Sequence, residues 1–170
     1  MDLTPLLPWL NLIHVLGVMA FILVHGASGL MSLKVRRERD RARIIAMVEL
    51  SSSFLNWAWL ALAVVFFGGI LAGIAGGWWT SGRLWIWASL LIFIAITVLM
   101  TPLAGAYMEG VRHAVGLASV QDKRKKLEAP PPASDEELER VLMSSKPVAA
   151  AVIGVTGITV LTWLMMMKPF

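Results

Sequence analysis

Four long stretches of the chain contain no Asp, Glu, Lys or Arg, and together they cover most of its length. They run over residues 3–33, 50–82, 84–108 and 147–167. About 20 helical residues cross a hydrocarbon layer about 30 Å thick, so each stretch is long enough to cross it once. Because backbone amides in lipid must be satisfied within their own segment, we expect helices rather than strands. The pattern predicts an all-α fold, a four-span transmembrane helical bundle.

The four predicted spans leave little chain for a separate soluble domain. We therefore expect residues 1–170 to form a single integral membrane domain. Its spans are placed at about 9–33, 52–78, 84–108 and 147–167, with charged connections at 34–51 and 109–146. The first stretch is longer than the apolar core of a signal peptide and follows no Lys or Arg, so it is interpreted as a retained span.

The composition excludes several classes of protein. Hydrophobic residues make up 58% of the chain and charged residues 15%, with a mean hydropathy of +0.73. An ordinary soluble domain carries about 25% charged residues. The chain has no cysteine, which excludes a disulfide framework, a thiolate metal site and a Cys nucleophile.

The basic residues predict an orientation. Thirteen of the fifteen Lys and Arg residues lie in the two connections, and only Arg83 and Lys168 lie elsewhere. By the positive-inside rule the connections face the cytoplasm and both termini lie outside. Six of the eight tryptophans fall at the outer ends, where an aromatic belt is expected: Trp9, Trp78, Trp79, Trp85, Trp87 and Trp163. Since topology accounts for the net charge of +4, we expect no nucleic-acid partner.

The second connection has its own pattern. A basic cluster, Lys123–Lys126, is followed by three prolines and then by Ser134 and Glu137, which are spaced as in a capping box. The next residues form an apolar stripe at helical spacing, made of Leu138, Val141 and Leu142. We expect a short amphipathic cytoplasmic helix that lies on the inner membrane surface before the last span.

Small residues recur at helical spacing in the second and fourth spans, where close packing of helices depends on them. They are Gly68, Gly69, Ala72, Gly73, Gly76 and Gly77, and Ala150, Gly154 and Gly157. Packing within one chain is favoured over a dimer interface. In the third span Pro102 predicts a bend, with Thr97 and Thr101 close enough to satisfy exposed carbonyls.

The strongly polar residues of the first span share one face. Asn11, His14, His25, Ser28 and Ser32 fall within a sector of about 100° on a helix. Ionisable groups at membrane depth usually point into a bundle or a wet cavity, which makes His14 and His25 candidate cofactor ligands, for example to haem b. Eleven residues separate them by about 16.5 Å, so they cannot share one metal ion. The favoured alternative is that both are hydrogen-bonded inside the bundle and hold helices in register.

One acidic residue adds a further hypothesis. Glu49 is expected in the first turn of the second span, where a carboxylate complements the helix dipole. A proton path from Glu49 toward His25 is conceivable, although no spacing requires it.

The segment from Leu10 to Gly17 reads L-N-L-I-H-V-L-G and is followed by a basic hairpin. It resembles the start of a bacterial family of predicted integral membrane proteins in the broad CopD-like group. That group includes copper-resistance D membrane proteins and a haem-associated protoporphyrinogen oxidase family. The resemblance implies a bacterial inner-membrane bundle in which His14 is the characteristic first-helix histidine. It does not imply copper transport, because the Met- and His-rich outer motifs are missing.

These patterns predict a non-enzymatic structural, accessory or assembly protein of the membrane. Its expected partners are the lipid bilayer and either further copies of itself or a larger membrane complex. One alternative is a b-type haem or redox protein that uses His14 or His25. Another is a small ion or proton transporter, which needs a wet path joining both histidines to Glu49. No phosphate loop, Ser-His-Asp set or HExxH motif is present.

Overall fold

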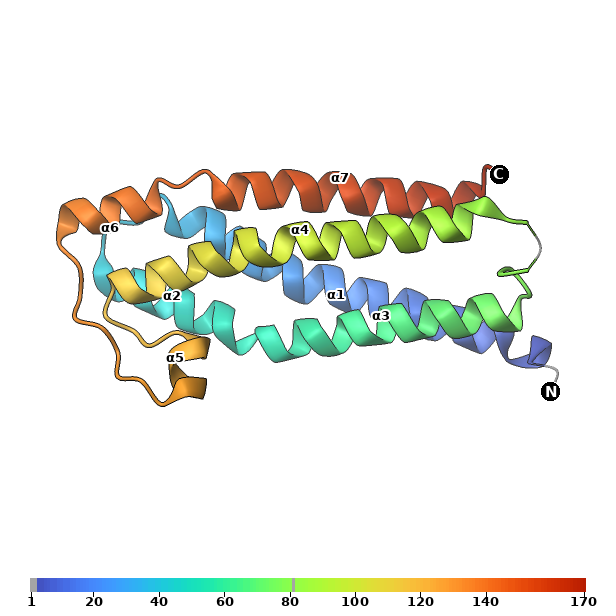
Figure 1. The fold of residues 1–170 in the computed structure, drawn as a ribbon, viewed down its shortest axis with the longest axis horizontal. Helices are drawn as coiled ribbons and strands as arrows, with labels where there is room; N and C mark the ends of the chain where they lie inside the picture. Colours follow the sequence, from blue (N-terminus) through green and yellow to red (C-terminus); the bar gives the residue numbers. More distant parts are fainter. Residues whose placement is uncertain (1–2, 81) are drawn as a thin grey trace. The chain divides into compact units, whose positions relative to one another are not determined.

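The computed structural model describes residues 3–80 and 82–170, and every regular element in this part of the chain is helical (Figure 1). A short 3-10 helix, η1 (Thr4–Leu6), leads into α1 (Leu7–Val35). The other helices are α2 (Arg41–Ser53), α3 (Leu55–Ala75), α4 (Leu84–Ala114), α5 (Val120–Lys125), α6 (Asp135–Leu142) and α7 (Lys146–Met167).

Four segments of the described chain are helical, long and apolar enough to cross a membrane. They are Thr4–Val35, Arg41–Ala75, Leu84–Ala114 and Asp135–Met167. This confirms the predicted all-α architecture with four spans.

Helix ends differ from the predicted span ends. Helix α2 begins at Arg41, inside the expected connection, because the carboxylate of Asp40 accepts a hydrogen bond from the amide of Ala42 at 2.9 Å. Helix α4 continues through Pro102 to Ala114, and the hydroxyl of Thr101 donates to the carbonyl of Thr97 at 2.7 Å. The hydrogen bond that Thr101 donates to a carbonyl confirms its predicted role, while the predicted role of Thr97 and the predicted bend remain predictions.

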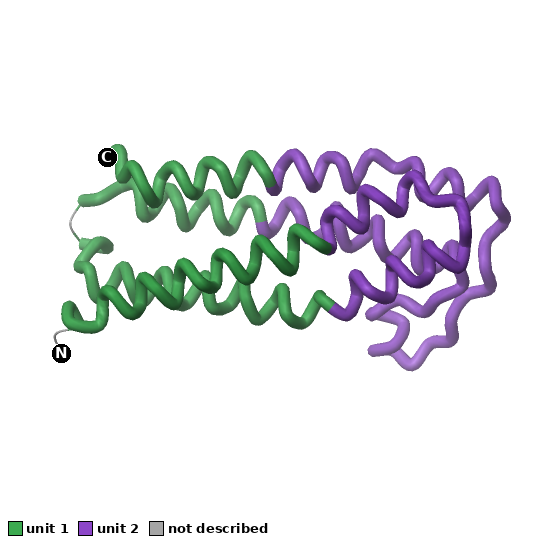
Figure 2. Tube along the Cα trace, turned by 180° about the vertical axis from the view of Figure 1, so that it is seen from behind, with its two compact units in different colours: residues 1–27, 54–96, 155–170 green, residues 28–53, 97–154 purple. Residues whose placement is uncertain are grey.

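The chain divides into two compact units (Figure 2). Unit 1 comprises residues 1–27, 54–96 and 155–170, and unit 2 comprises residues 28–53 and 97–154.

Unit 1 is packed around small residues and indole rings. Its buried cluster is formed by Trp85, Ile86 and Leu164, with Trp78 and Trp79 against it. The small residues pack within the chain, as favoured from the sequence: a Cβ added at Gly73 would lie 2.5 Å from Nε1 of Trp79, and one at Gly157 would overlap Ile96. For Gly77 the packing prediction is wrong, because this residue lies beyond the end of α3 with a φ of +62°.

Unit 2 is packed around a larger apolar cluster drawn from several helices. It contains Val35 of α1, Ile44 and Val48 of α2, Tyr107, Val111 and Ala114 of α4, Val115, and Leu138 and Leu142 of α6. The predicted helix after the prolines is confirmed as α6, with Ser134 at its N-cap accepting a hydrogen bond from the amide of Glu137 at 3.3 Å. Its apolar stripe packs against this protein core, so the expectation that the stripe lies on the membrane surface is wrong.

Candidate functional site

The five polar residues of α1 are half-buried, and none is fully exposed. Asn11, His14 and His25 belong to unit 1, whereas Ser28 and Ser32 belong to unit 2.

His14 is held against α3. Its Nδ1 atom lies 2.9 Å from the carbonyl oxygen of Val65, and a Cβ added at Gly69 would lie 3.0 Å from Cε1 of the ring. Because a carbonyl can only accept, Nδ1 carries the proton of this hydrogen bond, and in the neutral ring Nε2 has a free lone pair. The ring thus fills the space left by the missing side chain of Gly69.

His25 makes a different contact. Its ring stacks on that of Phe21, one turn earlier in the same helix, with centroids 4.8 Å apart and planes 11° from parallel. The stack covers one face of the imidazole with an apolar ring. This contact stays within α1, unlike the hydrogen bond of His14.

The two serines connect α1 to two other helices of unit 2. The hydroxyl oxygens of Ser28 and Ser51 lie 2.6 Å apart, which joins α1 to α2. The hydroxyl of Ser32 lies 3.4 Å from Sδ of Met108 on α4 and 3.1 Å from the carbonyl oxygen of Ser28. Both serines therefore contribute to helix packing.

Glu49 is exposed and lies near the C-terminal end of α2. The expectation that it begins a helix is wrong, because the helix starts two turns earlier, at Arg41. Its carboxylate therefore does not benefit from the positive end of a helix dipole. The proposed proton path stays a prediction.

Arg112 is a buried cation, and nothing in the charge pattern of the second connection distinguishes it from the exposed basic residues there. Only 7% of the surface of Arg112 is exposed. Nη1 donates to the hydroxyl of Ser52 at 2.9 Å, and Nε donates to the carbonyl of Ala118 at 2.9 Å. A buried guanidinium held by neutral oxygens has lost hydration, so these two hydrogen bonds matter for its stability. Arg112 thereby ties the last turn of α2 to the segment that leads into α5.

Beside Arg112, His113 and Asp122 form a close pair with a ring Nε2 to carboxylate Oδ2 distance of 2.6 Å. Asp122 and Ser119 also form a full capping box at the start of α5. The pKa of Asp122 falls from its ordinary 3.8 to about 2. The largest cause is the hydrogen bond that the backbone amide of Ser119 donates to the carboxylate, and hydrogen bonds from the ring of His113 and the hydroxyl of Ser119 contribute less. The sequence analysis did not predict this helix, although the S-x-x-D spacing from Ser119 to Asp122 is a signal that could have found it.

The histidines do not form a site with several protein ligands. Among the described residues, no group of three or more His, Cys, Asp or Glu side chains could hold a metal ion. The residues near His14 fit a single imidazole ligand, since a neutral His with Nδ1 hydrogen-bonded to a carbonyl is the usual form of a ligating histidine. They do not fit a metal ion shared by several side chains.

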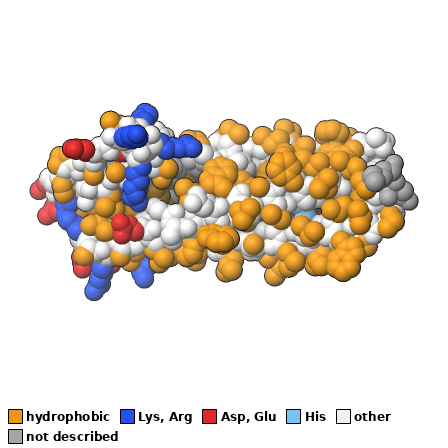
Figure 3. Space-filling model, turned by 90° about the horizontal axis from the view of Figure 1, so that it is seen from below, with side chains coloured by type: hydrophobic (Ala, Val, Ile, Leu, Met, Phe, Trp, Pro, Cys, Tyr) orange, Lys and Arg blue, Asp and Glu red, His pale blue; other side chains and the backbone are white. Residues whose placement is uncertain are grey.

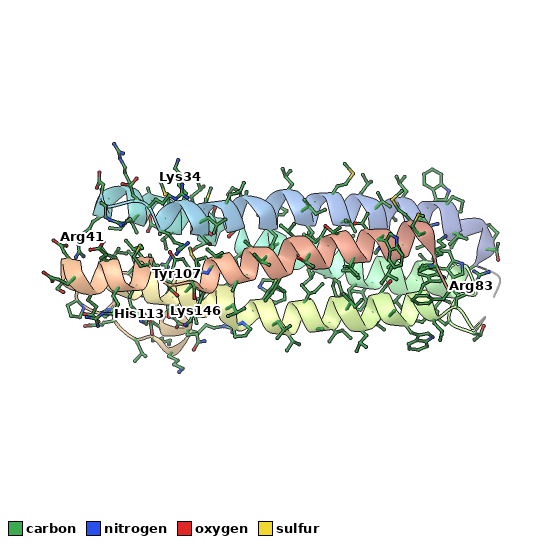
Figure 4. The ribbon with its side chains drawn as sticks, turned by 90° about the horizontal axis from the view of Figure 1, so that it is seen from above. Lys34, Arg41, Arg83, Tyr107, His113 and Lys146 are labelled. Carbon is green, nitrogen blue, oxygen red and sulfur yellow. The ribbon has the colours of Figure 1, made fainter. Side chains whose placement is uncertain are left out.

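Charge separates the two units. Unit 2 holds thirteen of the fifteen Lys and Arg residues, whereas unit 1 holds all eight tryptophans. Figure 3 shows Lys, Arg, Asp and Glu side chains gathered over one part of the visible face and hydrophobic side chains over the rest. Within unit 2, Arg41 (labelled in Figure 4) donates to the carboxylate of Asp135 at 2.7 Å, which joins α2 to the start of α6.

Comparisons of the chain with family models, with curated proteins and with solved structures found no match. The class follows from the chain itself. It is a multi-pass membrane protein, all-α over residues 3–80 and 82–170, with four apolar helical segments in that part of the chain.

Proposed function

We propose that this protein is a non-enzymatic structural, accessory or assembly subunit of the bacterial inner membrane. One observation carries the proposal: polar groups of α1 that could do chemistry are engaged in packing the chain. His14 is bonded to Val65, and Ser28 is bonded to Ser51. Interhelical hydrogen bonds of this kind fix helix register in a membrane.

The charge distribution supports an orientation with both termini outside. Both ends of the chain belong to unit 1, and nearly all basic residues belong to unit 2. The positive-inside rule places the basic connections in the cytoplasm. The bacterial inner membrane is the location implied by the resemblance at Leu10 to Gly17.

The coverage of α1 supports a partner within the membrane. Only 6% of the most apolar stretch of Thr4–Val35 is buried, against 33% for Arg41–Ala75. The large side chains exposed on α1 include Leu16, Met19 and Leu23. Lipid covers part of this exposed face of α1. The rest of the face contacts a second copy of the chain or another membrane subunit.

Extraction of the protein with its surrounding lipid into polymer-bounded discs, followed by native mass spectrometry, tests this function. We expect an assembly heavier than the single 18.6 kDa chain. Replacing Leu16 and Leu23 together by Ala should reduce the assembly to single chains, while Leu91→Ala on α4, which is also exposed, serves as the control. A single chain in the unsubstituted protein would overturn the assembly role.

A second candidate function, haem binding, is favoured by the hydrogen bond between His14 and Val65, which leaves Nε2 of His14 able to bind iron. Bound haem would supply redox or electron-transfer chemistry, and His14 would hold its iron. The absorption spectrum of purified protein tests it. A Soret band that is lost in His14→Ala but kept in His25→Ala would support this function over the first, and a colourless preparation would reject it.

A further inference from the structure

Helix α5 belongs to the charged connection, residues 109–146, that follows the charge-free stretch 84–108. Arg112 bonds both Ser52 on α2 and Ala118, two residues before α5. Ser52 follows Glu49, the last charged residue before the charge-free stretch 50–82, by only three residues. Three residues of a helix rise about 4.5 Å, so the start of α5 is held near the level at which the charge-free stretch 50–82 begins.

The orientation of α5 follows from its contacts. Asp122 faces the protein, because its carboxylate pairs with His113. At about 100° per residue, Val120 and Arg124 lie about 160° from Asp122 and Lys123 lies about 100° from it, so none of the three shares the side of the helix that carries Asp122. All three are exposed, and Val120 is 49% exposed. The outward face of α5 therefore combines an apolar residue with two cations.

The residues that follow Arg124 are also exposed and either basic or apolar. Lys125 and Lys126 are exposed, and Lys126 ends the helix with a φ of 55°. Leu127, which follows, is 57% exposed. None of the four consecutive cations, Lys123–Lys126, belongs to an ion pair among the described residues. Elsewhere in unit 2, Arg39, Arg41 and Arg43 are each paired with a carboxylate.

From this placement we propose that α5 and its C-terminal turn form a docking surface for anionic phospholipid headgroups of the adjoining leaflet. Lys123–Lys126 contact the headgroup phosphates, and Val120 and Leu127 enter the acyl boundary. Basic side chains near an anionic membrane surface are each attracted to it, and apolar side chains add burial. The inference concerns one surface and does not depend on the function proposed above.

The absence of native cysteine permits a clean test with one introduced label. Leu127→Cys is labelled with a fluorophore, and the protein is reconstituted into bilayers of phosphatidylcholine, with or without phosphatidylglycerol, that contain a spin-labelled lipid. We expect stronger quenching with phosphatidylglycerol, and we expect added salt to reverse the increase because it screens exposed charges.

Two variants with equal loss of charge separate this surface from a general effect of charge. The variant Lys123→Gln/Arg124→Gln should reduce the equilibrium constant for contact between α5 and the anionic lipid surface by about fivefold for each charge removed. The control Arg37→Gln/Arg140→Gln removes two exposed cations outside α5 and should leave quenching unchanged. Quenching that is independent of phosphatidylglycerol and salt would overturn the proposal even if the variants failed to fold. Equal effects of both variants would also overturn it, because the attraction would then belong to the net charge of the chain and not to α5.

Discussion

The ring of His14 and the backbone of Val65 are joined by a hydrogen bond of 2.9 Å between α1 and α3. The acceptor is a carbonyl oxygen of another helix, so this bond fixes both the rotation of α1 and the tautomer of the ring. A polar side chain at membrane depth thereby contributes to packing whether or not it also binds a ligand.

Replacing His14 should destabilise unit 1. His14→Ala removes the hydrogen bond to Val65 and leaves a space beside Gly69, so we expect the free energy of unfolding to fall by about 0.5–2 kcal/mol. Denaturation in mixed micelles, followed by circular dichroism, measures this loss. Leu91→Ala, at a site of the same unit that is 69% exposed, is the control. Equal effects of both changes would show that the bond contributes no stability.

Replacing glycine by alanine should lower the stability of the protein at Gly73 on α3 but not at Gly29 on α1. Gly73→Ala forces the indole of Trp79 to move and disturbs its bond to the carbonyl of Ile70, so we expect a loss of about 1–3 kcal/mol. Gly29→Ala meets nothing within 4 Å and should leave stability unchanged or raise it by up to about 1 kcal/mol. Parallel unfolding measurements compare the two, and equal tolerance would contradict the packing of Trp79 on α3.

The capping box of α5 should open in acid. The folded pKa of Asp122, about 2, lies below its ordinary 3.8, so the ionised carboxylate stabilises the folded helix. That contribution is fully present above about pH 4 and is lost as the pH falls through about 2. Hydrogen exchange at the amide of Ser119, corrected for its intrinsic rate, follows the loss. Asp122→Asn should exchange faster at neutral pH and show no such transition, whereas protection in acid equal to that at neutral pH would refute the assignment.

Helix α6 should depend on one buried side chain. Leu142 is 1% exposed in the apolar cluster of unit 2, whereas the next residue, Met143, is 57% exposed. Leu142→Ala should cost about 2–5 kcal/mol, because it leaves a cavity that its neighbours cannot fill. Met143→Ala should cost far less. Thermal unfolding of the two variants in detergent distinguishes them, and similar losses would mean that α6 lies on lipid, as its sequence alone suggests.

The four spans could be predicted because lipid imposes a simple rule on both composition and length. Helix ends were harder to predict, because charge marks where lipid ends and not where a helix ends. Helix α4 shows the difference: its charge-free stretch stops at Met108, yet the helix continues to Ala114, since Glu109 and Arg112 are compatible with helix outside hydrocarbon.

The candidate site was predictable only in part. Helical periodicity placed the polar residues of α1 on one face, and the structure leaves none of the five fully exposed. Their partners could not be predicted, because Ser51 and Met108 are brought to Ser28 and Ser32 by packing between distant segments. The pairing of His113 with Asp122 could not be predicted for the same reason, because the two residues lie on either side of a turn.

The apolar cluster of unit 2 also constrains the synthesis of the chain. Val35, Ile44 and Val48 leave the ribosome early, but Leu142, which covers them, follows Val35 by more than a hundred residues. At ordinary elongation rates this interval lasts roughly 5 to 20 s. For that time the nascent α1–α2 hairpin lacks the side chains of α6 that help to bury these residues in the folded chain.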